Sequence, residues 1–182
     1  SLDKHYGNRE KLVIALAEAL RGEVRALAEA GCDYIQVNDP LIIKDKGDAA
    51  LAARALTVML EGCSAETGVY TWFGSASGLL PALLDTPVDV IGLDFVSGPG
   101  NWDAVRSGFT KKLGFGIVDG RNTRLESPEQ IADAVKRITD IVPPERLYVN
   151  PSCGLEYVPR ETAFEKLKNM VEGARRAEGV PA

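Results

Sequence analysis

VDVIGLDF, residues 88–95, is a run of apolar and β-branched residues that closes on an aspartate and a phenylalanine. Its near-continuous apolar character predicts a strand buried on both faces, as in parallel sheets covered by helices. Asp94 then stands at the carboxyl end of a buried strand, where an unpaired carboxylate is costly. The stretch indicates an α/β fold and marks Asp94 as a candidate functional residue.

Strand-like and helix-like segments alternate on both sides of this run. β-branched and aromatic residues predict further strands over 33–40, 68–73, 113–119 and 146–151. Apolar residues at three- and four-residue spacing predict helices over 9–30, 49–61 and 160–177, a helix that begins at Ser127-Pro128, and short helices over 77–84 and 101–107. The apolar stripes of the helices, among them Leu16, Leu20, Phe164, Leu167, Met170 and Val171, are expected to face the core.

No hairpin signal interrupts the five strand–helix alternations, so we expect a parallel sheet with crossover helices. An open doubly wound sheet and a barrel both fit this order. Neither GxGxxG nor GxxxxGK[ST] occurs, which weakens the nucleotide-binding version. In both folds the functional residues gather at the carboxyl ends of the strands. The polar or unusual residues at those ends are Asn38, Asp39, Trp72, Asp94, Asp119 and the segment 150–153.

Composition excludes several classes of protein. The net charge of −5 and the scattered Lys and Arg residues argue against a nucleic-acid surface. No run of 18 apolar residues predicts a transmembrane helix, and residues 1–12 lack the apolar core of a signal peptide. Three widely spaced cysteines, Cys32, Cys63 and Cys153, suit reduced thiols in the cytoplasm. We expect a cytoplasmic protein with no nucleic-acid or membrane partner.

Three segments together resemble a known family. They are AGCDYIQVNDPLI (30–42), VDVIGLDF (88–95) and PPERLYVNPSCGLEYVPRETAFEKLKNMVEGARR (143–176). In order and spacing they are similar to the C-terminal catalytic barrel of cobalamin-independent methionine synthase, and especially to its shorter archaeal relatives. The resemblance implies a (β/α)8 TIM-type barrel, of which this chain, as one partial domain over 1–182, covers about the last five βα units. It also implies a homo-oligomer or a partner chain that supplies the missing strands.

The resemblance implies methyl transfer to a thiol such as that of homocysteine, from a folate or from a corrinoid-bound methyl group. Family members hold zinc with an HxC pair, an acidic residue and the cysteine of NPxCGL, which here correspond in part to Asp94 and Cys153. Zinc keeps a substrate thiol as thiolate at neutral pH. Tyr70 and Trp72 occupy the HxC positions, and the only histidine, His5, lies far upstream. A zinc site is therefore possible but degraded.

The same residues also admit structural interpretations. Cys153 is either a metal ligand or a small buried residue beside a turn, and Asp94 is either a catalytic or metal-binding carboxylate or a partner for backbone N–H groups. Asn38 replaces the family's aspartate for the substrate amino group, and with Asp39 it either binds substrate or caps a loop. Packing is the favoured role of Tyr70 and Trp72.

Anion-binding candidates complete the set. Arg121, with Arg124 nearby, is expected to meet a substrate carboxylate unless it is simply solvated, and the GSASG run over 74–78 offers backbone N–H groups. Two alternative functions are also consistent with the sequence. One is a diverged, zinc-less binding or regulatory protein, and the other is a metal-free enzyme that handles carboxylates like the related uroporphyrinogen decarboxylase barrels.

Overall fold

The computed structural model describes residues 3–44 and 46–179, and helices and strands alternate through them as predicted. In chain order the elements are α1 (Arg9–Glu29), β1 (Tyr34–Asn38), the 3-10 turn η1 (Lys46–Asp48), α2 (Ala49–Leu60), β2 (Glu66–Tyr70), α3 (Leu80–Leu84), β3 (Val90–Asp94), α4 (Asn101–Arg106), β4 (Lys112–Val118), α5 (Pro128–Thr139), the 3-10 turn η2 (Pro144–Arg146), β5 (Leu147–Pro151) and α6 (Arg160–Ala177). Within the described residues, no helix is both long and apolar enough to cross a membrane.

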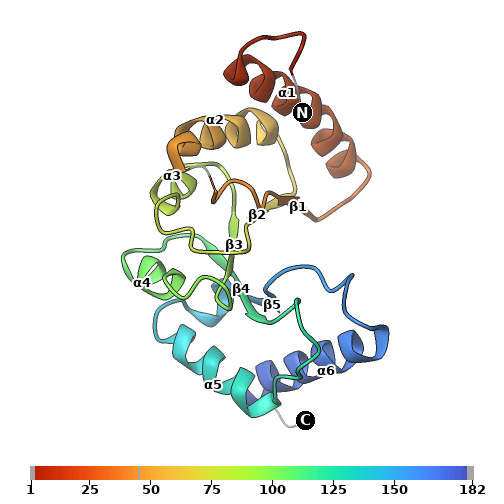
Figure 1. Cartoon of the computed structure of the whole chain (residues 1–182), viewed down its shortest axis with the longest axis vertical. Coiled ribbons are helices and arrows are strands. Elements are labelled where there is room, and N and C mark those ends of the chain that lie inside the picture. Colours follow the sequence, from red (N-terminus) through yellow and green to blue (C-terminus); the bar gives the residue numbers. More distant parts are fainter. Residues whose placement is uncertain (1–2, 45, 180–182) are drawn as a thin grey trace.

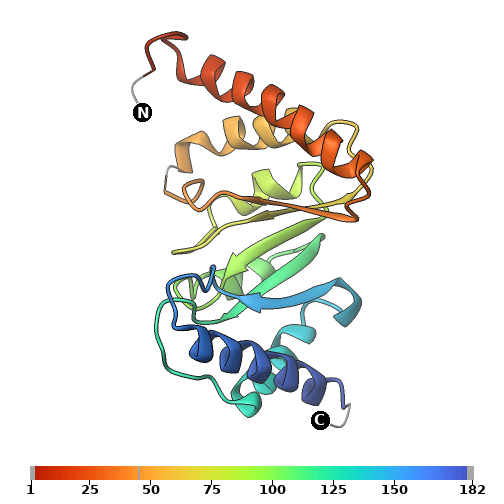
Figure 2. The same ribbon diagram turned by 90° about the vertical axis from the view of Figure 1, so that its right-hand side faces the viewer.

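The five strands form one parallel sheet in the order β1-β2-β3-β4-β5. Strand β3, which was predicted within residues 88–95 as buried on both faces, is the middle strand of this sheet, and all five of its residues are buried. Figure 1 shows the chain as an open C, with the strands inside, the helices on the convex side and the opening between the β1–α1 and β5–α6 ends. The strand arrows point to one side, so the loops that follow them share one end of the sheet (Figure 2).

The second strand lies two to three residues earlier than predicted. It covers Glu66–Tyr70 instead of residues 68–73, so Trp72 and Phe73 belong to the loop after it. Polar residues begin the strand because Glu66 forms an ion pair with Lys112 of β4, at 2.6 Å between Oε1 and Nζ. Such an interaction between distant strands leaves no local signal in the sequence.

The two faces of the sheet differ in chemistry. On the convex face Val69, Ile91, Leu93, Leu113 and Phe115 are buried under the helices and form the centre of the core. Helix α5 covers part of this face with the predicted stripe Ile131, Val135 and Ile138, and it begins with a capping box between Ser127 and Gln130. The predicted core interpretation of this helix is confirmed.

The concave face is strongly curved and polar. In a flat sheet β1 and β5 would lie about 19 Å apart, four strand spacings. Yet the rings of Tyr34 on β1 and Tyr148 on β5 have centroids only 6.0 Å apart. The Tyr148 hydroxyl also donates to Glu66 of β2 at 3.1 Å. Side chains from both edges therefore meet over the middle of the sheet, as they do inside a barrel.

Glycines make room for these rings. A Cβ on Gly92 would lie 1.9 Å from Cδ1 of Tyr70, and one on Gly114 would lie 2.6 Å from Cε1 of the same ring. Tyr70 thus lies flat across β3 and β4, and its hydroxyl oxygen is 3.2 Å from that of Tyr34. This arrangement confirms the packing interpretation of Tyr70.

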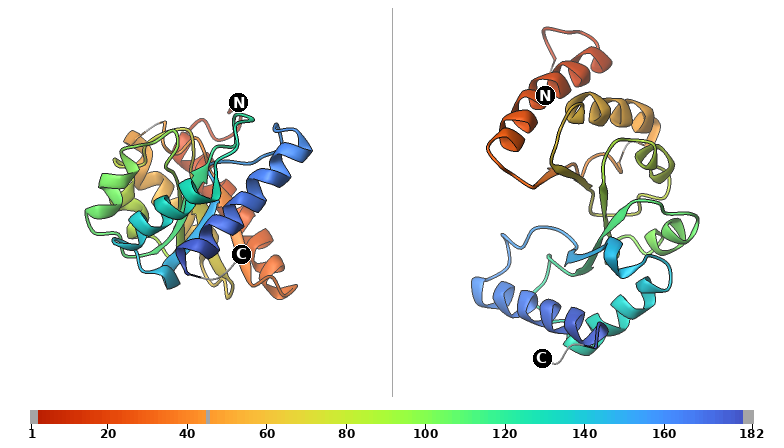
Figure 3. Two further views of the ribbon diagram at one scale, coloured as in Figure 1. Left: turned by 90° about the horizontal axis from the view of Figure 1, so that it is seen from below. Right: turned by 180° about the vertical axis from the view of Figure 1, so that it is seen from behind.

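Much of the apolar stripe on each terminal helix lies outside the core, which corrects the prediction, although Val24 is buried and Met170 packs against the core. On α6, Phe164, Leu167 and Val171 are 65%, 40% and 47% exposed, and the described residues buried on this helix are Lys166 and Gly173. On α1, Leu16 and Leu20 are about half exposed. The three- and four-residue spacing of apolar residues predicted the stripes, but such a pattern does not show which element of the fold packs on them. The helices that carry these stripes, α1 and α6, lie at the two ends of the C, which Figure 3 shows again from behind.

We expect the substitution Gly92→Ala to destabilise the chain by about 1–3 kcal/mol, because the new methyl group displaces the Tyr70 ring. Urea unfolding followed by circular dichroism measures the loss. Gly22→Ala in α1 is the matched control: no heavy atom lies within 4 Å of its Cβ position, so this change is expected to be neutral or stabilising. The explanation fails if Gly92→Ala costs the same in a Tyr70→Ala background, where the ring is absent.

Candidate active site

Asp94 organises the carboxyl end of the sheet. It is 1% exposed at the end of β3, and both of its carboxylate oxygens are occupied. Oδ2 accepts the backbone N–H of Phe73 at 2.9 Å. Oδ1 accepts those of Val96 and Ser97, at 2.9 and 2.8 Å. Three backbone donors satisfy this buried charge and bind the β2–α3 and β3–α4 loops to one point.

Asn101, at the start of α4, fastens the same two loops. Its Nδ2 donates to the carbonyl oxygen of Asp94 at 2.7 Å and to that of Gly74 at 3.3 Å, and its Oδ1 accepts the N–H of Ala76 at 2.8 Å. The Ala76 N–H of the GSASG run is thus already used inside the protein, which weakens the anion-binding interpretation. Sequence reasoning missed Asn101 because its partners lie 7 to 27 residues away.

The loop after β2 is strained. Phe73 has a φ angle of 71°, in the left-handed region that non-glycine residues seldom adopt, and such strain is often held at functional sites. The Arg121 guanidinium carbon lies 4.7 Å above the centroid of its ring, in cation–π geometry. Asp94 fixes the backbone of Phe73, so it indirectly places Arg121 as well.

Cys153 follows β5 and is partly buried beneath the β4–α5 loop. A Cβ on Gly120 would lie 2.7 Å from its Sγ, so only glycine allows this close approach. Burial is the main cause that raises the pKa of the Cys153 thiol, and the carboxylate of Asp94 adds to it. The hydrogen bond with Ser152 and the charge of Arg121 act in the opposite direction. Cys153, Asp94 and Arg121 therefore share one electrostatic environment, with the thiol protonated at neutral pH.

Asn38 and Asp39 lie at the end of the edge strand β1, two strands away from β3. Oδ1 of Asn38 accepts Nε2 of Gln36 at 2.7 Å. Oδ1 of Asp39 accepts the N–H groups of Leu41 and Ile42, both at 3.1 Å. These bonds favour the loop-capping interpretation of Asp39, while Asn38 keeps an exposed amide beside the opening. Their role in substrate binding stays a prediction.

The donor set of the described chain does not fit zinc. No group of three His, Cys, Asp or Glu side chains able to hold a metal ion occurs within residues 3–44 and 46–179. Of the two predicted ligands, Asp94 already accepts three N–H groups. His5 lies in the segment before α1, where its ring packs against that of Tyr6. We therefore derive no chemical step through a metal held by these residues.

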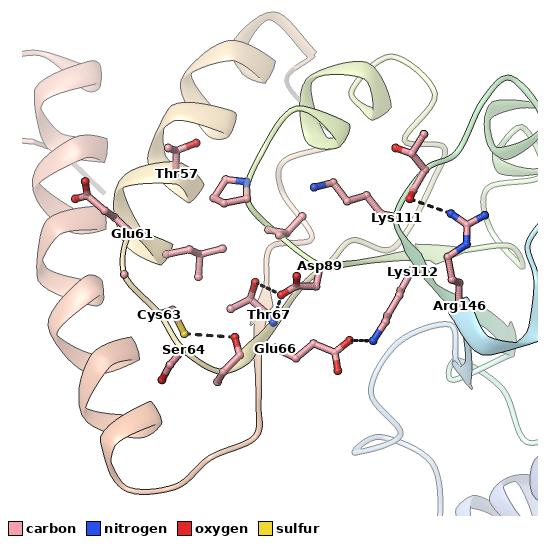
Figure 4. A pocket seen from close by; sticks show the side chains of 16 residues that line it. Thr57, Glu61, Cys63, Ser64, Glu66, Thr67, Asp89, Lys111, Lys112 and Arg146 are labelled. Carbon is pink, nitrogen blue, oxygen red and sulfur yellow. Dashed lines mark hydrogen bonds and ion pairs between the residues drawn. The ribbon is translucent and has the colours of Figure 1, made fainter.

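A large cavity, of about 920 Å³, lies at the other end of the sheet (Figure 4). Its charged side chains are engaged with protein groups: Lys112 pairs with Glu66, Asp89 accepts the N–H of Thr67 at 2.8 Å, and Arg146 donates to a backbone carbonyl at 2.9 Å. Barrel enzymes react at the carboxyl ends of their strands, whereas the amino ends contribute stability. We accordingly assign this cavity no role in the chemistry.

We expect Asp94→Asn to cost about 2–3 kcal/mol of stability, since an amide NH2 replaces an oxygen that accepts a backbone N–H. Thermal and urea unfolding measure the effect. Asp103→Asn on α4 is the control, because its side chain is 86% exposed and its ion pair with Arg106 is long, at 3.4 Å. If both substitutions cost the same, Asp94 is not the anchor of these loops.

Comparison with known proteins agrees with this geometry. The chain matches the family model of the cobalamin-independent synthase catalytic domain over residues 3–176. Methionine synthase from Saccharolobus islandicus is 33% identical over 179 residues, which cover 96% of this chain and 53% of that protein. Methionine synthase from Sulfurisphaera tokodaii is 33% identical over 177 residues, or 96% and 52% of the two chains. The chain thus spans about half the length of these relatives.

Solved structures show the same fold. A B12-independent methionine synthase from Shewanella sp. W3-18-1, in complex with selenomethionine, superposes with a TM-score of 0.88 at 24% identity, over 97% of this chain and 57% of that one. A putative vitamin-B12 independent methionine synthase from Listeria monocytogenes gives a TM-score of 0.73 at 17% identity, over 97% and 58%. The sheet is therefore part of a TIM-type barrel, and the chain belongs to the family of the cobalamin-independent synthase catalytic domain.

Proposed function

We propose that this chain forms part of a methionine-synthase-like methyltransferase, in which the methyl acceptor is a small thiol such as homocysteine. The observation that carries the proposal is the family match over 3–176, combined with a carboxyl end whose loops are gathered around Cys153, Asp94 and Arg121. The acceptor loses its proton to solvent, and its thiolate attacks the methyl carbon. The S–C bond forms while the bond to the carrier breaks, and that electron pair stays on a folate or corrinoid carrier.

The described residues would bind and orient the acceptor. Arg121 is exposed at the mouth of the site, and its guanidinium is held over Phe73, so it has donors left for a carboxylate. Asn38, exposed at the end of β1, offers an amide to the amino group. If the assembled protein uses zinc, ligands must join Cys153 from outside the described residues. Free cysteines at 32, 63 and 153 accord with a reducing cytoplasm.

Arg121→Gln is expected to raise the KM for homocysteine about tenfold and to change kcat little, since it removes a binding charge remote from the reacting sulfur. Transfer of a labelled methyl group to homocysteine, by this chain assembled with the barrel-completing segment of the Saccharolobus islandicus relative, measures both constants. Arg124→Gln is the control, because Arg124 is bonded through its backbone: its carbonyl accepts Nζ of Lys166, and its N–H donates to Oδ1 of Asn122 at 2.9 Å.

Two further measurements decide between the functions. Metal analysis of the assembled protein, with and without Cys153→Ala, tests whether zinc depends on this thiol. Homocysteine binding by calorimetry without any methyl transfer, using folate and corrinoid donors in turn, would overturn the methyltransferase and leave a binding protein. Binding of small carboxylates in place of homocysteine would instead favour the metal-free, carboxylate-handling type.

We also propose that further βα units cover the opening of the C. Its two borders carry uncovered strand edges and apolar side chains on α1 and α6, and a groove of about 350 Å³ beside Leu16, Leu20 and Leu41 runs along the β1 border. Exposed edges and apolar faces of this kind pair with other chains. The relatives are about twice as long, so their remaining half offers the required length.

The double substitution Leu167→Lys with Val171→Lys is expected to prevent this association and to leave the chain folded, because both side chains are exposed. Sedimentation of the chain alone, and mixed with the completing segment, reports the assembly. Thr57→Lys, at an exposed position on α2, is the control. Stable dimers of the chain alone that survive the double substitution would contradict this use of the α6 face.

A further inference from the structure

Lys166 of α6 is fully buried, which is rare for a lysine. Its Nζ forms an ion pair with Oε2 of Glu126 at 2.9 Å and donates to the backbone carbonyl of Arg124. Burying an ammonium group is expensive unless its donors are satisfied, and removal of one partner of such a pair is strongly destabilising. The pair joins the fully buried Lys166 of α6 to Glu126, whose side chain is 17% exposed, in the loop before α5.

Glu126 also makes hydrogen bonds at both ends of the β4–α5 loop. Its Oε1 accepts the N–H of Asp119, the first residue after β4, at 3.1 Å. Its carbonyl accepts Nδ2 of Asn169, one turn along α6 from Lys166, at 2.8 Å. The entry and the exit of the segment 119–126 are thus tied to each other and to α6.

The restrained segment reaches the candidate active site. Asp119 accepts the N–H of Arg121 at 2.8 Å, which sets the direction in which Arg121 leaves the loop. Arg121 then lies over the Phe73 ring, and Gly120 packs on Cys153 while its N–H donates to Ser152 at 3.3 Å. No residue of α6 itself is in these contacts, so α6 acts on the site through the loop.

We propose that Lys166 and Glu126 are positioning residues, whose buried ion pair holds the β4–α5 loop so that the charge of Arg121 stands beside Cys153. The inference deepens the proposed function, because it identifies what keeps the carboxylate-binding arginine of that site in place. It predicts that breaking the pair removes the local positive charge from Cys153 even though neither residue touches Cys153.

Cys153 reports this charge without substrate, methyl donor or partner. In a Cys32→Ser, Cys63→Ser background, the thiol is modified by an anionic aromatic disulfide and, separately, by a neutral pyridyl disulfide at the same pH and low salt. A nearby guanidinium lowers the thiol pKa and so changes both rates, but it attracts only the anionic reagent. The ratio of the two rates cancels the change in thiolate fraction and measures the presence of Arg121. Arg121→Gln sets the reference and is expected to lower the ratio about threefold to tenfold. High salt is expected to abolish the difference.

Lys166→Met and Glu126→Gln are expected to lower the ratio as far as Arg121→Gln does. Combining either with Arg121→Gln should then add nothing. Lys168→Met is the matched control, since Lys168 lies on the same helix in an exposed pair with Glu165 and should leave the ratio unchanged. Glu126→Gln keeps an acceptor for Asp119 and is the milder change if Lys166→Met does not fold.

A folded Lys166→Met or Glu126→Gln chain with an unchanged ratio overturns the proposal, and circular dichroism establishes the folding. Because no methyl transfer is measured, failure of the methyltransferase would leave this result standing. Conversely, an unchanged ratio together with normal transfer to homocysteine would remove the positioning role and leave the proposed function intact.

Discussion

The concave face of a tightly curved sheet has little room for side chains, and this constraint shapes the rest of the molecule. Glycines at 92 and 114 let Tyr70 lie flat on β3 and β4, and Tyr34 and Tyr148 converge from opposite edges. With side chains in place of these glycines, the rings would push the strands apart and flatten the sheet. Curvature also brings the carboxyl ends of β2 to β5 close enough for their loops to share polar contacts.

Those loops are held by buried polar groups rather than by apolar packing. Asp94 and Asn101 fasten the loops after β2 and β3, and the Lys166–Glu126 pair fastens the loop after β4. Each anchor is satisfied by several partners, so each is specific for one loop geometry. The same occupation leaves Asp94 little capacity for a metal, because three of the roughly four acceptor sites of a carboxylate already bind backbone N–H groups here.

Local patterns predicted the order of elements, the parallel sheet and the burial of β3, because a strand or helix signal lies within its own residues. The NPxCGL segment also pointed to the family, since a family signature is itself local. Contacts between distant residues were not predictable. In the sequence Lys166 looks like any other charged residue of an amphipathic helix. No residue near it predicts its pairing with Glu126, which lies 40 residues away.

The opposite error concerns the terminal helices, where the periodic stripes were real but the expected burial was wrong for residues such as Leu16, Leu20 and Leu167. A stripe such as Phe164, Leu167 and Val171 predicts that a face is covered, but the covering element need not belong to the same segment of chain. The exposure of these side chains accords with the proposal that further βα units cover this face. The difference between predicting a covered face and predicting what covers it matters here, because the chain spans about half the length of its relatives.

The charges around Cys153 link the candidate active site to the contacts that hold its loops. Burial and Asp94 raise the pKa of its thiol, while Arg121 opposes them through a loop that α6 holds in place. Further βα units over the opening would exclude more water from this end of the sheet, which strengthens every one of these interactions. On both proposals, the anchors within this chain would set the balance of charges at the thiol, and closure of the barrel would strengthen it.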